Sequence, residues 1–255
     1  MIKRPGMLVT TLSVTLLSFV LITPRKTKVY LIGDSTMCIK PPSAYPEAGW
    51  GMPFAFFFDQ TVQVENRAQN GRSTRTFMEA RLWKPVIDSL KEGDYVFIQF
   101  GHNDEVSTKD SYTDEKKFKE NLLQYVNETR SRNANPVLIT PVARRRFDSS
   151  GNVEGSHEIY SSIVRETAKV AGVPLIDLDK SSQELLQKLG PVNSKALFLN
   201  LEKDEHPNFP DGKEDNTHFS EYGARKIAEL VLAGIRSLKL DLASKIVNAG
   251  KTSPK

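Results

Sequence analysis

Three residue types that can together hydrolyse an ester stand near the two ends of the sequence. Ser35 comes directly after an apolar run at residues 29–32, while Asp215 and His218 lie three positions apart near the other end. A serine hydroxyl is a weak nucleophile until an imidazole removes its proton, and a carboxylate can hold that imidazole in the required tautomer. The sequence therefore predicts Ser35 as nucleophile, His218 as general base and Asp215 as the residue that orients His218.

The residues around Ser35 exclude one common class of serine hydrolase. Residues 33–37 read Gly-Asp-Ser-Thr-Met, without the second glycine of the G-x-S-x-G turn that carries the nucleophile in α/β-hydrolases. An apolar run that ends at a glycine still indicates a buried strand leading into a sharp turn. We expect Asp34 to order that turn through side-chain-to-backbone hydrogen bonds.

Apolar runs alternate with amphipathic patterns along the rest of the chain, which is typical of βαβ units. Strands are expected at residues 29–32, 61–65, 95–100, 136–140 and 173–178. Helices are expected at residues 76–90, 113–132, 157–171, 181–189 and 220–240, the last with Ser220 as its N-cap. The pattern predicts one α/β domain over residues 27–255, a three-layer α/β/α sandwich around a mostly parallel sheet.

Polar segments follow three of the predicted strands, at residues 33–35, 69–73 and 101–104. Ligands of parallel sheets bind at the carboxyl ends of the strands, so these segments are expected to meet at one rim.

Four sequence blocks occur in a fixed order: Gly-Asp-Ser at 33–35, Gln-Asn-Gly at 69–71, Gly-x-Asn-Asp at 101–104 and Asp-x-x-His at 215–218. The chain thereby resembles the SGNH, or GDSL-type, hydrolase superfamily from residue 33 to residue 224. Residues 33–37, 100–104, 141–147 and 215–219 further resemble rhamnogalacturonan acetylesterases and their bacterial relatives. The resemblance implies a flavodoxin-like, five-stranded sheet.

The resemblance also implies three donors for the oxyanion of a tetrahedral intermediate. These are the backbone N–H groups of Ser35 and Gly71 and the side-chain amide of Asn103. Glycine suits position 71 because backbone must approach the substrate closely there, and a neutral amide at Asn103 stabilises an oxyanion without trapping it.

Six further residues are candidates for substrate binding, and each has a structural alternative. Trp50 lies between two glycines and could stack on a sugar or pack internally. Arg144 and Arg145 could pair with uronate carboxylates or belong to a solvated loop. The candidates are Trp50, His102, Arg144, Arg145, His157 and His206.

Composition and charge limit the other classes of function. Hydrophobic residues make up 39% and charged residues 26%, which is a globular composition. The net charge is only +4, and the sequence has no basic stripe interleaved with aromatic residues, so we expect no nucleic-acid partner. Four histidines occur without metal-ligand spacing, and the one cysteine, Cys38, is expected to be buried filler. We therefore predict no metal and no cofactor.

The amino-terminal residues 1–26 resemble a secretory signal. Lys3 and Arg4 precede an uncharged stretch at residues 7–22, which is short for a membrane span, and no A-x-A cleavage site follows. We expect a secreted or periplasmic protein, with an uncleaved anchor as the alternative and no other stable membrane partner.

The family resemblance implies a carboxylic ester hydrolase, a carbohydrate acetylesterase. It would remove acetyl groups from a plant cell-wall polysaccharide, rhamnogalacturonan (pectin), through an acetyl-Ser35 intermediate. Acetylated polysaccharide or oligosaccharide is then the expected partner. The alternatives are a lipase or thioesterase acting on other acyl esters, a deacetylase of another polysaccharide such as xylan, and a carbohydrate-binding relative without activity.

Overall fold

The main sheet of the computed structural model, which describes residues 25–247, has five strands in the order β3-β1-β4-β5-β6. Every neighbouring pair in it is parallel. The strands are β1 (Thr27–Gly33), β3 (Val62–Asn66), β4 (Tyr95–Gln99), β5 (Asn135–Ile139) and β6 (Leu175–Ile176). In order of appearance this is a 2-1-3-4-5 arrangement, so the predicted three-layer, flavodoxin-like fold is confirmed.

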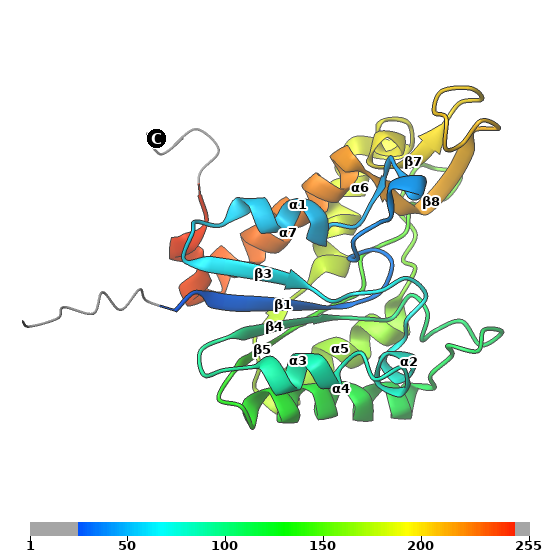
Figure 1. Cartoon of the computed structure of the whole chain (residues 1–255). Helices are drawn as coiled ribbons and strands as arrows, with labels where there is room; N and C mark the ends of the chain where they lie inside the picture. Colours follow the sequence, from blue (N-terminus) through cyan, green and yellow to red (C-terminus); the bar gives the residue numbers. More distant parts are fainter. Residues whose placement is uncertain (1–24, 248–255) are drawn as a thin grey trace, which may run out of the picture.

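Helices cover both faces of this sheet (Figure 1). One face is covered by α1 (Gly51–Phe54), α6 (Leu178–Asn193) and α7 (Glu221–Ser237). The other face is covered by α2 (Thr74–Glu79), α3 (Lys84–Ser89), α4 (Glu115–Arg130) and α5 (Glu158–Ala171). Short 3-10 helices complete the chain: η1 (Pro42–Ala44), η2 (Ala55–Phe57), η3 (Ser194–Leu197) and η4 (Asp241–Lys245).

The apolar run of β1 reflects burial on both faces. Val29 and Leu31 belong to the core under α1 and α7, while Tyr30 and Ile32 belong to the core under α2–α5. Successive side chains of a strand point to opposite faces, so a strand covered on both sides must be apolar at every position. This packing fixes the position of the carboxyl end of β1, and with it the position of the turn that carries Ser35.

A second, antiparallel sheet was not predicted from the sequence. It contains β2 (Glu47–Ala48), β8 (Lys213–Ser220) and β7 (Phe198–Leu201), in the order β2-β8-β7. It lies beyond the carboxyl ends of the main strands (Figure 1). Residues 213–220, which include Asp215 and His218 and lie outside the predicted strands, thus form a strand, although β8 is rich in polar residues with low strand propensity.

Three helix predictions need correction at their boundaries. The helix expected at 181–189 is longer at both ends, since α6 runs over Leu178–Asn193. The helix expected at 76–90 is two helices, since Arg81 has a positive φ of 57° and Pro85 occupies the first turn of α3. Proline favours the start of a helix and disfavours its interior, which explains the break. The last helix begins at Glu221, and the hydroxyl of Ser220 accepts a hydrogen bond from Gly223 N as the predicted N-cap.

The predicted signal segment lies almost entirely outside the described residues, so it stays a prediction. Within residues 25–247, no helix combines the length and apolar character needed to cross a membrane.

Candidate active site

The turn that carries Ser35 is fixed by its neighbour Asp34. The Asp34 carboxylate accepts hydrogen bonds from Thr36 N at 2.9 Å and from Thr36 Oγ1 at 2.8 Å. Asp34 is fully buried, and burial raises the pKa of its carboxyl group against the effect of these bonds. The expectation that Asp34 orders the turn agrees with this geometry.

The three residues expected to perform the chemistry lie in one hydrogen-bonded row. Ser35 Oγ is 2.9 Å from His218 Nε2, and His218 Nδ1 is 2.8 Å from Asp215 Oδ2. An ionised carboxylate can only accept, so Nδ1 carries the ring proton and Nε2 is the acceptor for the serine hydroxyl. This is the arrangement in which imidazole acts as a general base.

Asp215 is held as a carboxylate by donors from three groups. Its Oδ1 accepts from Thr217 N at 2.8 Å and from His218 N at 2.9 Å. Burial acts to raise its pKa, but the hydrogen bonds from the His218 side chain and from the two backbone N–H groups outweigh burial. The pKa of Asp215 is therefore well below its usual range.

A bulge in β8 presents this pair. Phe198 of β7 pairs with Phe219, whereas Asn200 pairs with Glu214, so residues 215–218 of β8 lie opposite a single β7 residue. Bulges bend a strand and redirect its side chains, often next to active sites. The bulge explains how residues three positions apart on a strand can point toward each other.

The three expected oxyanion donors border the same cavity as Ser35. Within residues 25–247, the backbone N–H groups of Ser35 and Gly71 have no acceptor. Gly71 has φ of +72°, and a Cβ built there would meet nothing within 4 Å. Asn103 Nδ2 donates to Arg72 O at 3.1 Å, which orients the amide and leaves its second N–H free.

The cavity has a volume of about 370 Å³ and is polar. No residue that lines it, among those described, has an apolar side chain. The lining residues are Ser35, Glu47, Asn70, Gly71, His102, Asn103, Lys109, Arg144, Asp215, Thr217 and His218.

Arg144 and His102 are thus the two substrate-binding candidates that reach this cavity. Arg144 donates to Thr217 Oγ1 at 2.8 Å and lies 3.3 Å from Glu105 Oε1. His102 is only 4% exposed, and burial holds its pKa well below the usual value, so the ring is neutral.

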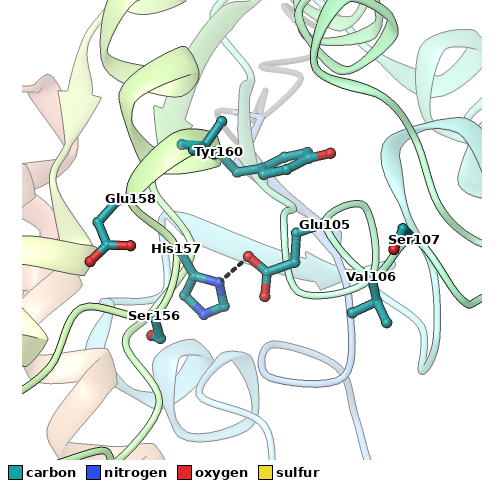
Figure 2. Close-up of a pocket in the computed structure, with 8 residues that line it drawn as sticks. Glu105, Val106, Ser107, Ser156, His157, Glu158 and Tyr160 are labelled. Atoms are coloured by element: carbon teal, nitrogen blue, oxygen red, sulfur yellow. Dashed lines mark hydrogen bonds and ion pairs between the residues drawn. The ribbon is translucent and has the colours of Figure 1, made fainter.

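His157 lies behind this cavity and not in it. Its Nδ1 is 2.8 Å from Glu105 Oε2 (Figure 2), and both residues line a neighbouring hollow of about 470 Å³. Its ring also contacts His102, with a centroid distance of 4.3 Å. Glu105 therefore links His157 to Arg144, and the His157 side chain is fully buried, so it is not placed for a direct substrate contact.

Trp50 does not contact substrate, because it is fully buried. Its Nε1 donates to Gln99 Oε1 at 2.7 Å, Gln99 Nε2 donates to Thr36 Oγ1 at 2.8 Å, and Thr36 Oγ1 donates to Asp34. This buried chain of hydrogen bonds runs from α1 to the turn that carries Ser35. The internal alternative is the correct one.

Two more candidates lie away from the cavity. Arg145 donates to Asn216 Oδ1 at 2.8 Å and to Ser194 Oγ at 3.1 Å, so it holds β8 and does not face the site. His206 lies between β7 and β8, with its ring 5.3 Å from that of Tyr45, and is not among the cavity residues.

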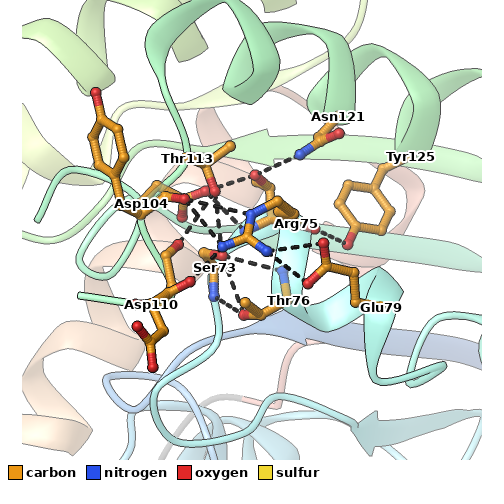
Figure 3. A network of polar contacts seen from close by, with 12 residues as sticks. Ser73, Arg75, Thr76, Glu79, Asp104, Asp110, Thr113, Asn121 and Tyr125 are labelled. Carbon is orange, nitrogen blue, oxygen red and sulfur yellow. Dashed lines mark hydrogen bonds and ion pairs between the residues drawn. The ribbon is translucent and has the colours of Figure 1, made fainter. Parts of the chain in front are cut away.

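A polar network fixes the loop that carries Asn103 (Figure 3). The adjacent Asp104 accepts from Thr74 N at 2.9 Å and from Thr74 Oγ1 at 2.6 Å, and its own carbonyl accepts from Thr113 N at 3.0 Å. Tyr125 Oη donates to Thr74 O at 2.8 Å. The expectation that Asp104 is structural agrees with these contacts.

Four cavity residues were not predicted: Glu47, Asn70, Lys109 and Thr217. Asn70 and Thr217 lie inside blocks that carried the family resemblance, so adjacency was the available signal. Glu47 and Lys109 lie in segments without a motif. Over the described range, no group of three or more His, Cys, Asp or Glu side chains is placed to hold a metal ion.

Comparison with known sequences places the site in a family. The family model described as GDSL-like lipase/acylhydrolase matches residues 29–231. The rhamnogalacturonan acetylesterase RhgT of Bacillus subtilis is 42% identical over 223 residues, covering 87% of this chain and 94% of that protein. The probable rhamnogalacturonan acetylesterase YesY of the same organism is 34% identical, covering 86% and 97%.

Solved structures show the same architecture. Protein YxiM of B. subtilis superposes with a TM-score of 0.74 at 26% identity, covering 86% of this chain and 58% of that longer one. The acetylxylan esterase Axe2 of Geobacillus stearothermophilus gives a TM-score of 0.59 at 19% identity, covering 83% and 94%. At that identity, the second likeness shows the fold alone.

Proposed function

The chain belongs to the GDSL-like lipase/acylhydrolase family, and on that basis we propose that it is a serine esterase that removes O-acetyl groups from rhamnogalacturonan. The 2.9 Å contact between Ser35 Oγ and His218 Nε2 is the observation that supports ester hydrolysis by a serine nucleophile with a histidine base. The substrate class is supported by the two relatives named as rhamnogalacturonan acetylesterases, which match over nearly their whole length.

Ser35 Oγ attacks the acetyl carbonyl while His218 Nε2 takes the hydroxyl proton. The tetrahedral intermediate collapses, the bond to the sugar oxygen breaks, and His218 returns the proton to that oxygen. Water then attacks acetyl-Ser35 with the same base, releasing acetate and restoring the serine. Proton transfer of this kind contributes about 10² to 10⁴ in rate.

The negative charge of the intermediate is stabilised by the free N–H groups that border the cavity. Ser35 N, Gly71 N and Asn103 Nδ2 supply three donors, and the hydrogen bond to Arg72 O already holds the Asn103 amide. Preorganised donors of this type are worth about 10² to 10³ in kcat each.

The polarity of the cavity opposes a long acyl chain. A fatty acyl group gains affinity by leaving water for apolar surface, and none of the described residues that line this cavity contributes an apolar side chain. Acetyl is small enough to need no such surface. A chain-length series of nitrophenyl esters should therefore show activity falling steeply beyond acetate.

Cationic side chains in the cavity can bind an acidic polymer. Lys109 and Arg144 line the cavity; Lys109 has no ion pair within the described residues, and Arg144 shares the Glu105 carboxylate with His157. These two cations suit the uronate carboxylates of rhamnogalacturonan.

The decisive experiment measures acetate release from acetylated rhamnogalacturonan by the parent and by Ser35→Ala, with acetylated xylan in parallel. Release from the pectic polymer that the substitution abolishes supports the proposal. Release from xylan alone keeps the serine esterase and overturns the substrate class. Nitrophenyl acetate cleavage without release from either polymer leaves only the catalytic residues supported.

We also propose that the protein acts outside the cytoplasm, because its polymeric substrate is extracellular and residues 1–26 resemble a secretory signal. Detection of the chain, still beginning at Met1, solely in a cytosolic fraction would contradict this.

A further inference from the structure

A buried lysine lies beside the active-site cavity without a role in ester hydrolysis. The side chain of Lys40 is only 2% exposed. Lysine is rarely so buried unless it is paired, because removing an ammonium group from water is costly. What Lys40 holds in place is therefore informative.

The ammonium group of Lys40 binds two residues that line the cavity. Its Nζ lies 2.6 Å from Glu47 Oε1 and 2.8 Å from Asn70 Oδ1. Cys38 Sγ donates to the same Asn70 oxygen at 3.0 Å. Since an ammonium group can only donate, these contacts determine which side of the Asn70 amide is oxygen.

Fixing the oxygen of Asn70 leaves its amino group toward the cavity side. Asn70 is exposed, and within residues 25–247 its Nδ2 donates to nothing. Glu47 Oε2 likewise has no hydrogen-bond partner among the described residues, while Oε1 is held by Lys40. One wall of the cavity thus presents an oriented donor and an oriented acceptor next to Ser35.

We propose that Asn70 and Glu47 bind hydroxyl groups of the sugar that carries the acetyl ester, and that Lys40 is the positioning residue for both. A sugar diol offers an acceptor and a donor on neighbouring carbons, which matches an amide N–H and a carboxylate oxygen. The inference rests on the proposed function, because it concerns the alcohol portion of the same ester.

The charge of this wall distinguishes it from a carboxylate site. Glu47 would repel a uronate carboxylate, whereas a charged acceptor strengthens a hydrogen bond from a hydroxyl. The wall therefore recognises neutral ring positions, while Arg144 and Lys109 are the cationic side chains of the cavity lining. A site built to bind hydroxyls discriminates strongly against esters that lack them.

The test compares two esters with the same acetyl group, acetylated rhamnogalacturonan oligosaccharide and nitrophenyl acetate. Asn70→Asp keeps an oxygen for Lys40 and replaces the donor that faces the cavity by an acceptor. Glu47→Gln also keeps an oxygen for Lys40 but replaces the acceptor that faces the cavity by a donor. We expect each variant to lower the ratio of kcat/KM for the sugar ester to that for nitrophenyl acetate by about tenfold. Asn127→Asp and Glu92→Gln, exposed changes at the opposite edge of the sheet, are the matched controls.

Each outcome separates the inference from the function on which it rests. A parent that cleaves nitrophenyl acetate but not the oligosaccharide contradicts the proposed function. A parent that cleaves both, with unchanged ratios in Asn70→Asp and Glu47→Gln, overturns the sugar-binding role. Equal losses on both esters also overturn it, because they would place these residues in the acyl chemistry.

The positioning role of Lys40 has its own readout. In Lys40→Met only the weak thiol donor of Cys38 still holds the Asn70 oxygen, so the amide is less firmly oriented. Adding Asn70→Asp to Lys40→Met should therefore change the ratio by less than twofold, whereas Asn70→Asp in the parent changes it about tenfold. Additive effects would show that Lys40 does not act through Asn70. Thermal unfolding of each variant identifies loss of fold, and the two single changes at the wall still test the proposal if Lys40→Met does not fold.

Discussion

Ser35 Oγ lies 2.9 Å from His218 Nε2, although 183 positions separate the two residues in the chain. The serine stands at the end of β1 in the parallel sheet, and the histidine stands on β8 in the antiparallel sheet. The contact therefore depends on how the second sheet is docked beyond the carboxyl ends of the first. Substitutions at Asp215 and Asn103 test the chemistry, and those at Trp50 and Asp104 test its support.

Asp215→Asn should lower kcat by about 10⁴-fold with little loss of stability. The amide oxygen can still accept from Thr217 N and His218 N, so the bulge keeps its shape. The amide nitrogen would instead face His218 Nδ1 as a donor and force the ring into the wrong tautomer. Steady-state kinetics on nitrophenyl acetate, together with the thermal unfolding midpoint, measure both quantities. A loss below tenfold would show that Asp215 does not orient the base.

Asn103→Ala should lower kcat by about 10² to 10³-fold while KM changes little, because the donor is needed mainly in the transition state. The substitution also removes the hydrogen bond to Arg72 O, so the loop itself has to be checked. Asn121→Ala, a buried asparagine of α4 in the network behind the loop, is the control for loss of structure alone. Similar losses of kcat in both variants would contradict an oxyanion role.

Lys109→Gln should raise KM for acetylated rhamnogalacturonan by about two- to fivefold, the range expected for one exposed ion pair. The effect should shrink as salt is added, because exposed charges are screened. A substrate with its uronate carboxyls reduced to alcohols is the matched control, and Lys91→Gln, at the amino edge of the sheet, is the matched variant. An equal change of KM on both substrates would exclude carboxylate recognition.

The parallel sheet was predictable from the sequence because each of its long strands is buried on both faces. The four central residues of β1 are all fully or almost fully buried: Val29, Tyr30, Leu31 and Ile32. A strand buried on both faces can be recognised in the sequence as an unbroken apolar stretch. The antiparallel sheet was not predictable for the opposite reason. β8 is half-exposed, reads Lys-Glu-Asp-Asn-Thr-His-Phe-Ser, and becomes a strand only through its pairing with β7 and β2.

The candidate site also contains residues that were predictable from the sequence and residues that were not. The residues expected in the chemistry occur in blocks with a recognisable spacing, and the structure brings all five around one cavity. Glu47 and Lys40 carry no such signal, because their placement depends on the pairing of the short strand β2 with β8 and on a buried ion pair between the two residues. Trp50 between two glycines was ambiguous in the sequence, and burial decides it.

Trp50→Phe should destabilise the fold by about 1–3 kcal/mol, since it leaves the buried oxygen of Gln99 without its donor. The aromatic volume is largely kept, so the lost hydrogen bond is the main change. At a temperature well below the unfolding midpoint, kcat should fall less than the loss of stability would suggest, because Asp34 still orders the turn that carries Ser35. Urea unfolding measures the free energy of unfolding. Trp83→Phe, which leaves the half-buried carboxylate of Glu128 without its indole donor, should cost less, because that carboxylate can still be solvated.

Asp104 gives a pH dependence of stability whose sign can be worked out. Burial raises the pKa of Asp104 from 3.8 to about 7, against the hydrogen bonds from Thr74 that lower it. Between these values the folded protein holds a proton that the unfolded chain has lost. The free energy of unfolding therefore falls as pH rises from about 4 to about 7, by an amount on the order of 4 kcal/mol from this group.

Asp104→Asn removes that titration while its amide oxygen can still accept from Thr74 N and Thr74 Oγ1. The stability of the variant relative to the parent should therefore increase with pH between about 4 and 7, and then level off. Urea unfolding of both proteins over this range measures the difference, which cancels the titration of all other groups. A difference that is constant, or that decreases with pH, would mean that Asp104 is ionised in the folded protein and that the Thr74 donors outweigh burial.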